Sequence, residues 1–240
     1  MLILSLDTCN SRGSAALLRD ETVLQCAVHE TGEEYSIWLP NAMEGLLRAE
    51  SVGWKDIDFF AVVTGPGSFT GLRVGLTTAK GFAEVYGKKI AAVPRLEAIA
   101  SRAAEAGEWV AVAVEGGRGE VYCALYRRAG GELRREGQEC VLAPDQFLSR
   151  VAQAAPAGGV FWCTPGTEGI AGLEGWATRA ALGDKLDSGE VALATAAGKI
   201  GYGLARAGKL VDALALDANY IRRPDAERFW EEARAGSHAR

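Results

Sequence analysis

Residues 57–86 decide the fold, because they place an apolar strand, a glycine-rich loop and a long helix in immediate succession. The stretch reads IDFFAVVT (57–64), GPGSFT (65–70) and GLRVGLTTAKGFAEVY (71–86). The apolar, partly β-branched run 57–64 predicts a central strand, and the spacing of apolar residues in 71–86 predicts a helix. A strand followed by a loop and a helix is the repeating unit of an α/β fold with parallel strands.

The loop between them reads Gly65-Pro66-Gly67-Ser68-Phe69-Thr70-Gly71. Its backbone N–H groups at the start of a helix would suit an anion. However, no Gly-Lys-Ser/Thr follows at the spacing of a P-loop, and Thr70 stands where a dinucleotide-binding fingerprint has its third glycine. We therefore expect a tight turn in which Ser68 or Thr70 caps the helix, in preference to a ligand site.

Strands and helices of the same kind surround this unit. Ahead of it, three apolar segments joined by tight turns predict an antiparallel meander, and the next segment has helical spacing; the meander covers 2–6, 14–19 and 23–28, and the helix 35–50. After it, a strand at 90–93 and a helix at 95–106 complete a first α/β lobe.

The order of elements starts again at residue 108. Strands are predicted at 109–114, 121–127, 160–163 and near 133–136, a turn at 115–119, and helices at 144–154 and 191–207. We therefore predict two lobes, residues 1–104 and residues 105–240, with the last segment of the second lobe packing back on the first. Residues 166–190 have no readable pattern, and the tail 236–240 is expected to be loose.

The composition is that of a globular protein. The 240 residues carry a net charge of −5 and are 48% hydrophobic, which excludes disordered, collagen-like and disulfide-scaffold classes. An acidic chain without a block of Lys or Arg is poorly suited to bind nucleic acid by itself. The five cysteines form no Cys-x-x-Cys pair, no apolar run reaches the ~18 residues of a membrane helix, and Asp7 interrupts the first apolar run. We expect a cytoplasmic protein with reduced thiols.

The histidine count limits the catalytic options. The chain has two histidines, His29 and His238, and His238 lies in the tail. A Ser-His-Asp or Cys-His arrangement would have to use His29, which we expect to be an exposed loop residue. The histidine count therefore disfavours a serine or cysteine protease.

Two of the predicted helices carry more apolar surface than one sheet can cover. A helix that covers a sheet needs a single apolar stripe, but a second stripe of small, aromatic or β-branched residues runs along each of these two. In the helix 35–50 it comprises Trp38, Ala42, Gly45 and Ala49; in the helix 71–86 it comprises Val74, Thr78, Gly81 and Val85. We predict that these residues form an interface with another protein chain, with Trp38 as an aromatic anchor. The alternative is that both helices are enclosed within their own lobe.

Several segments of the chain resemble the TsaB family, also called YeaZ. They are Asp7-Thr8, the run 65–75, Thr78-Ala79-Lys80-Gly81, Leu39-Pro40, Leu46-Leu47, the run 93–100, Gly119-Glu120-Val121-Tyr122 and Tyr220-Ile221-Arg222. The resemblance covers residues 1–128 in good register, and the long glycine loop is its most specific part.

The resemblance implies a two-lobed fold of the actin/Hsp70/sugar-kinase type, which is RNase H-like, with a mixed sheet and helices in each lobe. It also implies that the chain is a partner subunit in tRNA processing. The reaction concerned is the threonylcarbamoyladenosine modification at position 37 of tRNAs that read codons beginning with A. The partners implied are a TsaD-type catalytic subunit, a TsaE-type ATPase and, for the isolated protein, a second copy in a homodimer. The chain would meet tRNA mainly through the complex, with no membrane involved.

The same resemblance bears on catalysis. TsaD-like relatives bind a metal through a His-x-x-x-His pair, and the matching positions here are Arg95 and Ile99. A guanidinium repels a cation and a hydrocarbon side chain offers it no lone pair, so we expect no metal site and a scaffold in place of an enzyme. Two alternatives stay open: an ATP-dependent phosphotransferase or ATPase of the same superfamily, and a glycoprotease-like (M22-like) peptidase.

A vestigial phosphate site is the feature that would favour the ATP-binding alternative. Asp7 and Thr8 end the first strand, and Gly116 and Gly117 resemble the phosphate-binding hairpin of the catalytic relatives. Glu115 places a negative charge beside that hairpin, where it would repel a phosphate, and the single carboxylate of Asp7 supplies few ligands for magnesium. We expect no bound cofactor beyond weak binding of ATP and magnesium.

Overall fold

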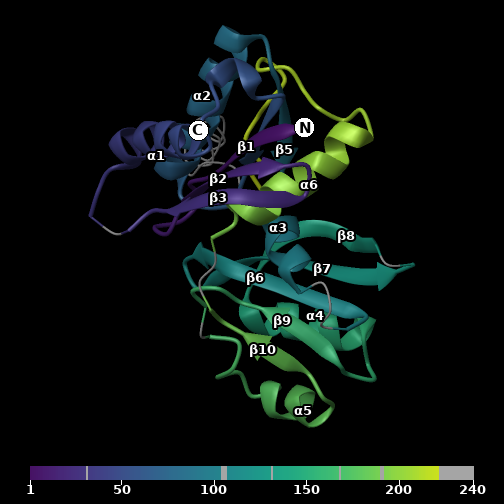
Figure 1. Cartoon of the computed structure of the whole chain (residues 1–240). Coiled ribbons are helices and arrows are strands. Elements are labelled where there is room, and N and C mark those ends of the chain that lie inside the picture. The colour runs from purple at the N-terminus through teal and green to yellow at the C-terminus, as the bar shows by residue number, and fades with distance from the viewer. Residues whose placement is uncertain (31, 104–106, 131, 168, 190–191, 222–240) are drawn as a thin grey trace, which may run out of the picture.

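The computed structural model describes residues 1–30, 32–103, 107–130, 132–167, 169–189 and 192–221. These residues form two lobes, one above the other in Figure 1, each built on a five-stranded sheet. The tail 236–240 and Arg222 lie outside the described residues. Within the described part, no helix combines the length and the apolar character needed to cross a bilayer.

The first sheet contains the predicted meander. Its strands are β1 (Leu2–Asp7), β2 (Ser14–Arg19), β3 (Thr22–Val28), β4 (Phe59–Val63) and β5 (Lys89–Val93), in the spatial order β3-β2-β1-β4-β5. β1, β2 and β3 pair antiparallel, whereas β4 pairs parallel with β1 and β5. Both predicted pairings are confirmed, because tight turns join the first three strands and helices join the others.

Helices cover both faces of this sheet. α1 (Tyr35–Ala49) and α2 (Phe69–Tyr86) pack on one face, where the rings of Phe60 and Phe82 lie 6.3 Å apart. α6 (Ala194–Arg206) packs on the other face, where Gly201 meets Phe59 and Ala61. Successive residues of a strand point to opposite faces, which is why Phe59 and Phe60 contact different helices. The last described helix thus belongs to the core of the first sheet.

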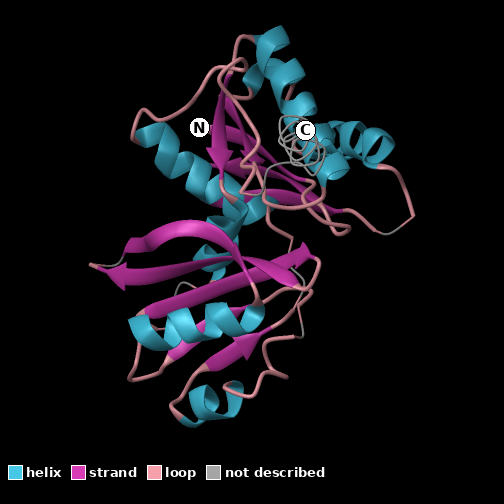
Figure 2. Cartoon of the chain, turned by 180° about the vertical axis from the view of Figure 1, so that it is seen from behind, coloured by secondary structure: helices cyan, strands magenta, loops and turns pink. Residues whose placement is uncertain are grey.

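The second sheet repeats the plan of the first. Its strands are β6 (Trp109–Gly117), β7 (Glu120–Ala129), β8 (Glu132–Leu142), β9 (Val160–Cys163) and β10 (Lys185–Asp187), in the order β10-β9-β6-β7-β8. β6, β7 and β8 pair antiparallel, and β9 pairs parallel with β6 and β10. α3 (Arg95–Arg102) contacts the face toward the first lobe, and α4 (Pro144–Ala154) covers the outer face, as Figure 2 shows from behind.

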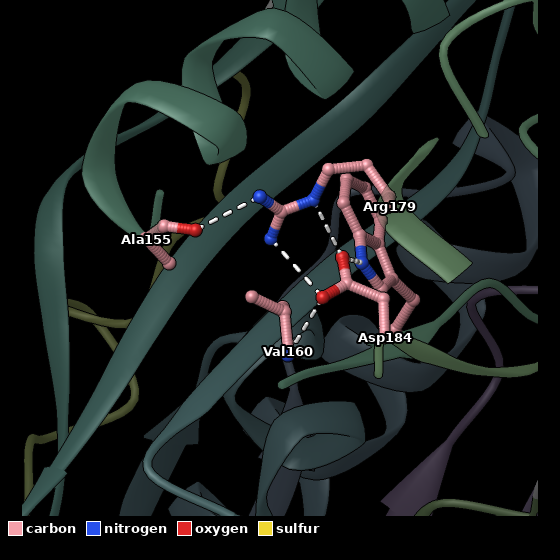
Figure 3. A network of polar contacts seen from close by, with 5 residues as sticks. Ala155, Val160, Arg179 and Asp184 are labelled. Carbon is pink, nitrogen blue, oxygen red and sulfur yellow. Dashed lines mark hydrogen bonds and ion pairs between the residues drawn. The ribbon is translucent and has the colours of Figure 1, made fainter. Parts of the chain in front are cut away.

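A buried ion pair holds the segment in which the sequence has no readable pattern. Residues 166–190 contain α5 (Trp176–Ala181) and β10. Arg179 on α5 donates from Nε to Asp184 at 2.8 Å and from Nη1 to the carbonyl of Ala155 at 2.8 Å (Figure 3). Asp184 also accepts from the backbone N–H of Val160 and from the indole of Trp162. Polar contacts with β9, which leave no periodic signal in the sequence, therefore hold this segment.

The glycine loop is shaped by close packing against the end of β1. Methyl groups added at Gly67, Gly71 and Gly75 would lie 2.2–2.3 Å from oxygen atoms of Thr8 and Cys9. Thr8 Oγ1 also donates to the carbonyl of Gly71 at 2.7 Å. The hydroxyl of Ser68 accepts from the N–H of Gly71, so the predicted tight turn with Ser68 as the helix cap is confirmed.

We expect Gly71→Ala to lower the free energy of unfolding by about 3 kcal/mol, because its methyl group would overlap the backbone of Thr8. Gly81→Ala, in the same helix, is the matched control: nothing lies within 4 Å of its added methyl group. That variant should gain about 0.5–1 kcal/mol, the usual benefit of alanine over glycine in a helix. Urea unfolding of both variants measures the difference, and equal effects would contradict the packing explanation.

Candidate functional site

A cavity of about 290 Å³ opens between the two lobes. Its first-lobe wall comes from the turn after β1, the glycine loop and the start of α3, and its second-lobe wall from the end of β6 and the segment after β9. The lining residues are Cys9, Asn10, Ser11, Gly67, Ser68, Arg95, Val114, Glu115, Pro165 and Gly166. The cavity thus lies at the carboxyl ends of the central strands of both sheets.

Arg95 is the buried cation of this cleft. Its side chain is 6% exposed, and its guanidinium donates from Nη1 to the carbonyl of Pro66 at 3.0 Å. Its backbone N–H donates to the carbonyl of Gly65 at 2.7 Å. Arg95 therefore joins the first turn of α3 to the glycine loop.

Asp7 lies buried at the end of β1 and faces the charge of Arg95. Its Oδ1 accepts from the N–H of Cys9 at 2.9 Å, while Oδ2 has no hydrogen-bond partner among the described residues. Burial raises the pKa of Asp7 above its ordinary value, although the positive charge of Arg95 and the hydrogen bond from Cys9 oppose that shift. The carboxyl group is enclosed by protein and does not line the cavity.

Arg95 and Ile99, one turn apart on α3, stand at the two positions where the resemblance to the catalytic relatives implies metal-binding histidines. Ile99 is 2% exposed and packs in the core. A guanidinium and a hydrocarbon side chain do not fit a metal ion, since neither has a lone pair to donate. Among the described residues, no group of three or more His, Cys, Asp or Glu side chains is placed to hold one.

The four residues of the suggested phosphate site are not brought together around the cavity. Thr8 is 1% exposed and bonded to Gly71, and neither Asp7 nor the glycines Gly116 and Gly117 line the cavity. The predicted turn at 115–119 is wrong in its bounds, because β6 continues through Gly117. The two residues of the turn itself, Arg118 and Gly119, have φ of 58° and 74°, as a tight type I′ hairpin turn requires.

His29 is not the exposed loop residue that the sequence led us to expect. It is 5% exposed, and its two ring nitrogens lie 3.0 Å from the carbonyl of Ser11 and 2.7 Å from that of Glu33. The rings of Tyr35 and Trp38 pack against it, with centroids 4.3 Å and 5.1 Å away. The ring is buried because the segment before α1 folds back on the turn after β1, a contact that local sequence does not encode.

The eight residues predicted for a partner interface lie on α1 and α2, and the structure grades their exposure. Trp38, Ala42, Val74 and Thr78 are half-buried, and Gly45, Ala49, Gly81 and Val85 are exposed. On α2 the stripe lies opposite the residues that pack on the sheet, because each residue turns the helix by about 100°. Val85 is 75% exposed, and open space surrounds Gly45 and Gly81. Trp38 is partly covered by His29 and Tyr35 of its own lobe.

An aromatic stack at the end of α2 was not predicted. Trp54 stacks on Phe82 with centroids 4.3 Å apart, and Tyr86 extends the stack. The spacing of Phe82 and Tyr86 indicates neighbours on one helix face, but Trp54 comes from the short helical turn Trp54–Asp56 before β4. Val85, which precedes Tyr86 in the chain, is exposed.

Glu97 lies on α3 between Arg95 and Ile99. Burial, the largest effect, and the nearby carboxylate of Glu139 raise the pKa of Glu97, while Arg135 and Lys209 oppose the shift. The folded protein therefore binds a proton at Glu97 more readily than the unfolded chain does.

Comparison with known proteins gives one consistent result. A family model described as "TsaD: tRNA N6-adenosine threonylcarbamoyltransferase" matches residues 29–164. The tRNA threonylcarbamoyladenosine biosynthesis protein TsaB of Escherichia coli is 31% identical over 208 residues, which are 82% of this chain and 83% of that protein. The TsaB protein of Bacillus subtilis is 32% identical, over 61% of each chain. The solved structure of YeaZ from Pseudomonas aeruginosa is 27% identical and superposes with a TM-score of 0.73, covering 91% of this chain and 99% of that one.

We expect the free energy of unfolding of the wild-type protein to fall, relative to that of Glu97→Gln, as the pH rises above 4.5. The fall begins at the ordinary pKa of a glutamate, 4.5, and ends above the higher pKa of Glu97 in the folded protein. In that pH range the folded wild-type protein binds a proton at Glu97 that the unfolded chain has lost, whereas the glutamine of the variant binds no proton at any of these pH values. Urea unfolding at a series of pH values measures the slope, with Glu84→Gln at an exposed position as the control. A wild-type slope equal to that of Glu97→Gln would contradict the assignment.

Proposed function

Because this chain belongs to the TsaB family, we propose that it is the non-catalytic partner of a TsaD-type catalytic subunit in tRNA threonylcarbamoyladenosine biosynthesis. The complex adds threonylcarbamoyl to adenosine 37 of tRNAs that read codons beginning with A. Within it, this chain supplies a surface that binds the catalytic subunit. The observation that carries the proposal is the buried side chain of Arg95 at the cleft.

Arg95 and Ile99 support a role without catalysis. The resemblance to the catalytic relatives places their metal-binding histidines at these two positions. Here a guanidinium, 6% exposed and bonded to the carbonyl of Pro66, occupies the first position, and a core isoleucine occupies the second. A fixed positive charge at this point opposes cation binding. We infer that the chain carries out no metal-dependent transfer or peptidase reaction of its own.

The outward face of α1 and α2 supports the partner role. Exposed small residues such as Gly45 and Gly81 would let the backbone of another helix approach closely, and Val85 offers apolar area beside them. A partner with the same two-lobed fold would present an equivalent pair of helices, so that the two pairs pack as a four-helix interface. The family model of the transferase matches 136 residues of this chain, 29–164, which include both helices and support a TsaD-type subunit as a partner of similar fold.

The same surface would serve the isolated protein in a homodimer, since two copies present identical faces. Contact with tRNA would come mainly through the complex, because a chain of net charge −5 has little to attract phosphates. A TsaE-type ATPase would be a third component, and a cytoplasmic location follows from this role.

We expect Gly45→Arg and Gly81→Arg each to weaken binding to a TsaD-type subunit by at least about 100-fold, because a guanidinium without a partner would be buried in the interface. Gly203→Arg is the matched control, since Gly203 is an exposed glycine of α6 with nothing within 4 Å of an added methyl group. Calorimetric titration gives the affinities, and circular dichroism verifies the fold of each variant. Unchanged binding by both α1 and α2 variants would show that the partner uses another surface.

The isolated wild-type chain should hydrolyse no ATP when supplied with ATP and magnesium. Steady turnover by the chain alone, at a rate that falls in Asp7→Asn, would contradict the non-catalytic role and favour a phosphotransferase or ATPase.

A further inference from the structure

Two cysteines of the second lobe face each other across neighbouring strands. Cys123 on β7 and Cys140 on β8 are paired in register, and their Sγ atoms lie 3.4 Å apart. A disulfide needs the sulfurs at about 2.05 Å, so a movement of little more than ~1 Å separates this contact from a covalent bond. Cys123 belongs to the core between the second sheet and α4, and Cys140 packs against that core while remaining partly exposed.

A cation stands beside one of the two sulfurs. Arg150 on α4 places Nη1 3.0 Å from Cys140 Sγ. Gly137 makes room for the guanidinium, because a methyl group there would lie 2.9 Å from Arg150 Nη2. In the described part of the chain, Arg150 forms no ion pair with a carboxylate. Its positive charge therefore lies beside Cys140 Sγ, where it attracts an anionic oxidation transition state.

The two cysteines are not equivalent. Cys123 is fully buried, and burial, followed by the neighbouring Cys140, raises the pKa of its thiol far above the ordinary range. Cys140, on the edge strand of the sheet, is partly exposed. Cys140 is therefore accessible to a small reagent, and Cys123 lies buried beside it.

We propose that Cys123 and Cys140 form a peroxide-sensitive dithiol in which Cys140 reacts first and Cys123 closes a disulfide. This proposal is independent of the proposed function. The thiolate of Cys140 attacks one oxygen of hydrogen peroxide, the O–O bond breaks, and the departing hydroxide takes a proton and leaves as water. Cys140 is then a sulfenic acid. The sulfur of Cys123 attacks Cys140 Sγ, its proton leaves with the hydroxyl group as a second water, and the S–S bond forms.

The other cysteines provide internal controls. Cys26 is exposed on β3, whereas Cys9 and Cys163 are buried, and each is a free thiol. If exposure alone governed reactivity, Cys26 would react first. If the pairing and Arg150 govern it, Cys140 reacts first although it is less exposed.

The test is oxidation of the full chain with hydrogen peroxide, followed by mass spectrometry without reduction. We expect loss of two hydrogens and a cross-linked peptide pair containing Cys123 and Cys140. Cys123→Ser should stop at a sulfenic acid on Cys140, which dimedone traps, and Cys140→Ser should leave Cys123 unmodified. Arg150→Met, similar in length without the charge, should slow the reaction by about tenfold, and Arg150→Lys should restore part of the rate.

Circular dichroism of each variant separates loss of the fold from loss of reactivity. Oxidation of Cys26 ahead of Cys140, a pair that stays reduced, or an Arg150→Met variant that reacts as fast as the wild type would each overturn the proposal.

Discussion

The close approach of α2 to the end of β1 is the constraint on which the rest of the first lobe depends. Gly67, Gly71 and Gly75 leave no room for a Cβ atom against Thr8 and Cys9, so the loop after β4 must turn directly under the backbone of β1. This contact fixes the axis of α2 on the sheet through Leu72, Leu76 and Ala79. The face opposite the sheet is thereby directed outward, where Gly81 and Val85 are free to meet another chain.

The same loop also sets the chemistry of the cleft. The carbonyl of Pro66 accepts from the guanidinium of Arg95, and that charge faces the buried carboxyl group of Asp7. The cation of the cleft is thus bonded to the backbone of the glycine loop, and the carboxyl group of Asp7 is enclosed by protein. A cleft whose cation is bonded to its own backbone is consistent with the scaffold that we propose, in which the helices α1 and α2 bind the partner.

Local patterns predicted the regular part of the fold, and long-range contacts account for what they missed. The periodic segment that begins with Pro144 predicted the observed bounds of α4, and the apolar run 160–163 predicted those of β9. The burial of His29 depends on a carbonyl from the turn after β1. Residues 166–190 are held by the hydrogen bonds of Asp184. These long-range contacts leave no periodic signal in the sequence. For the site, the helical spacing of small, aromatic and β-branched residues predicted the second stripes on α1 and α2, but the covering of Trp38 by His29 and Tyr35 is a tertiary contact.

The central claim is that this chain acts through the outward face of α1 and α2. Hydrogen–deuterium exchange of the chain with and without a TsaD-type subunit tests it most directly. We expect slower exchange on binding within Tyr35–Ala49 and Phe69–Tyr86 and unchanged exchange in α4 and β8. Protection confined to the second lobe, with both helices unaffected, would contradict it.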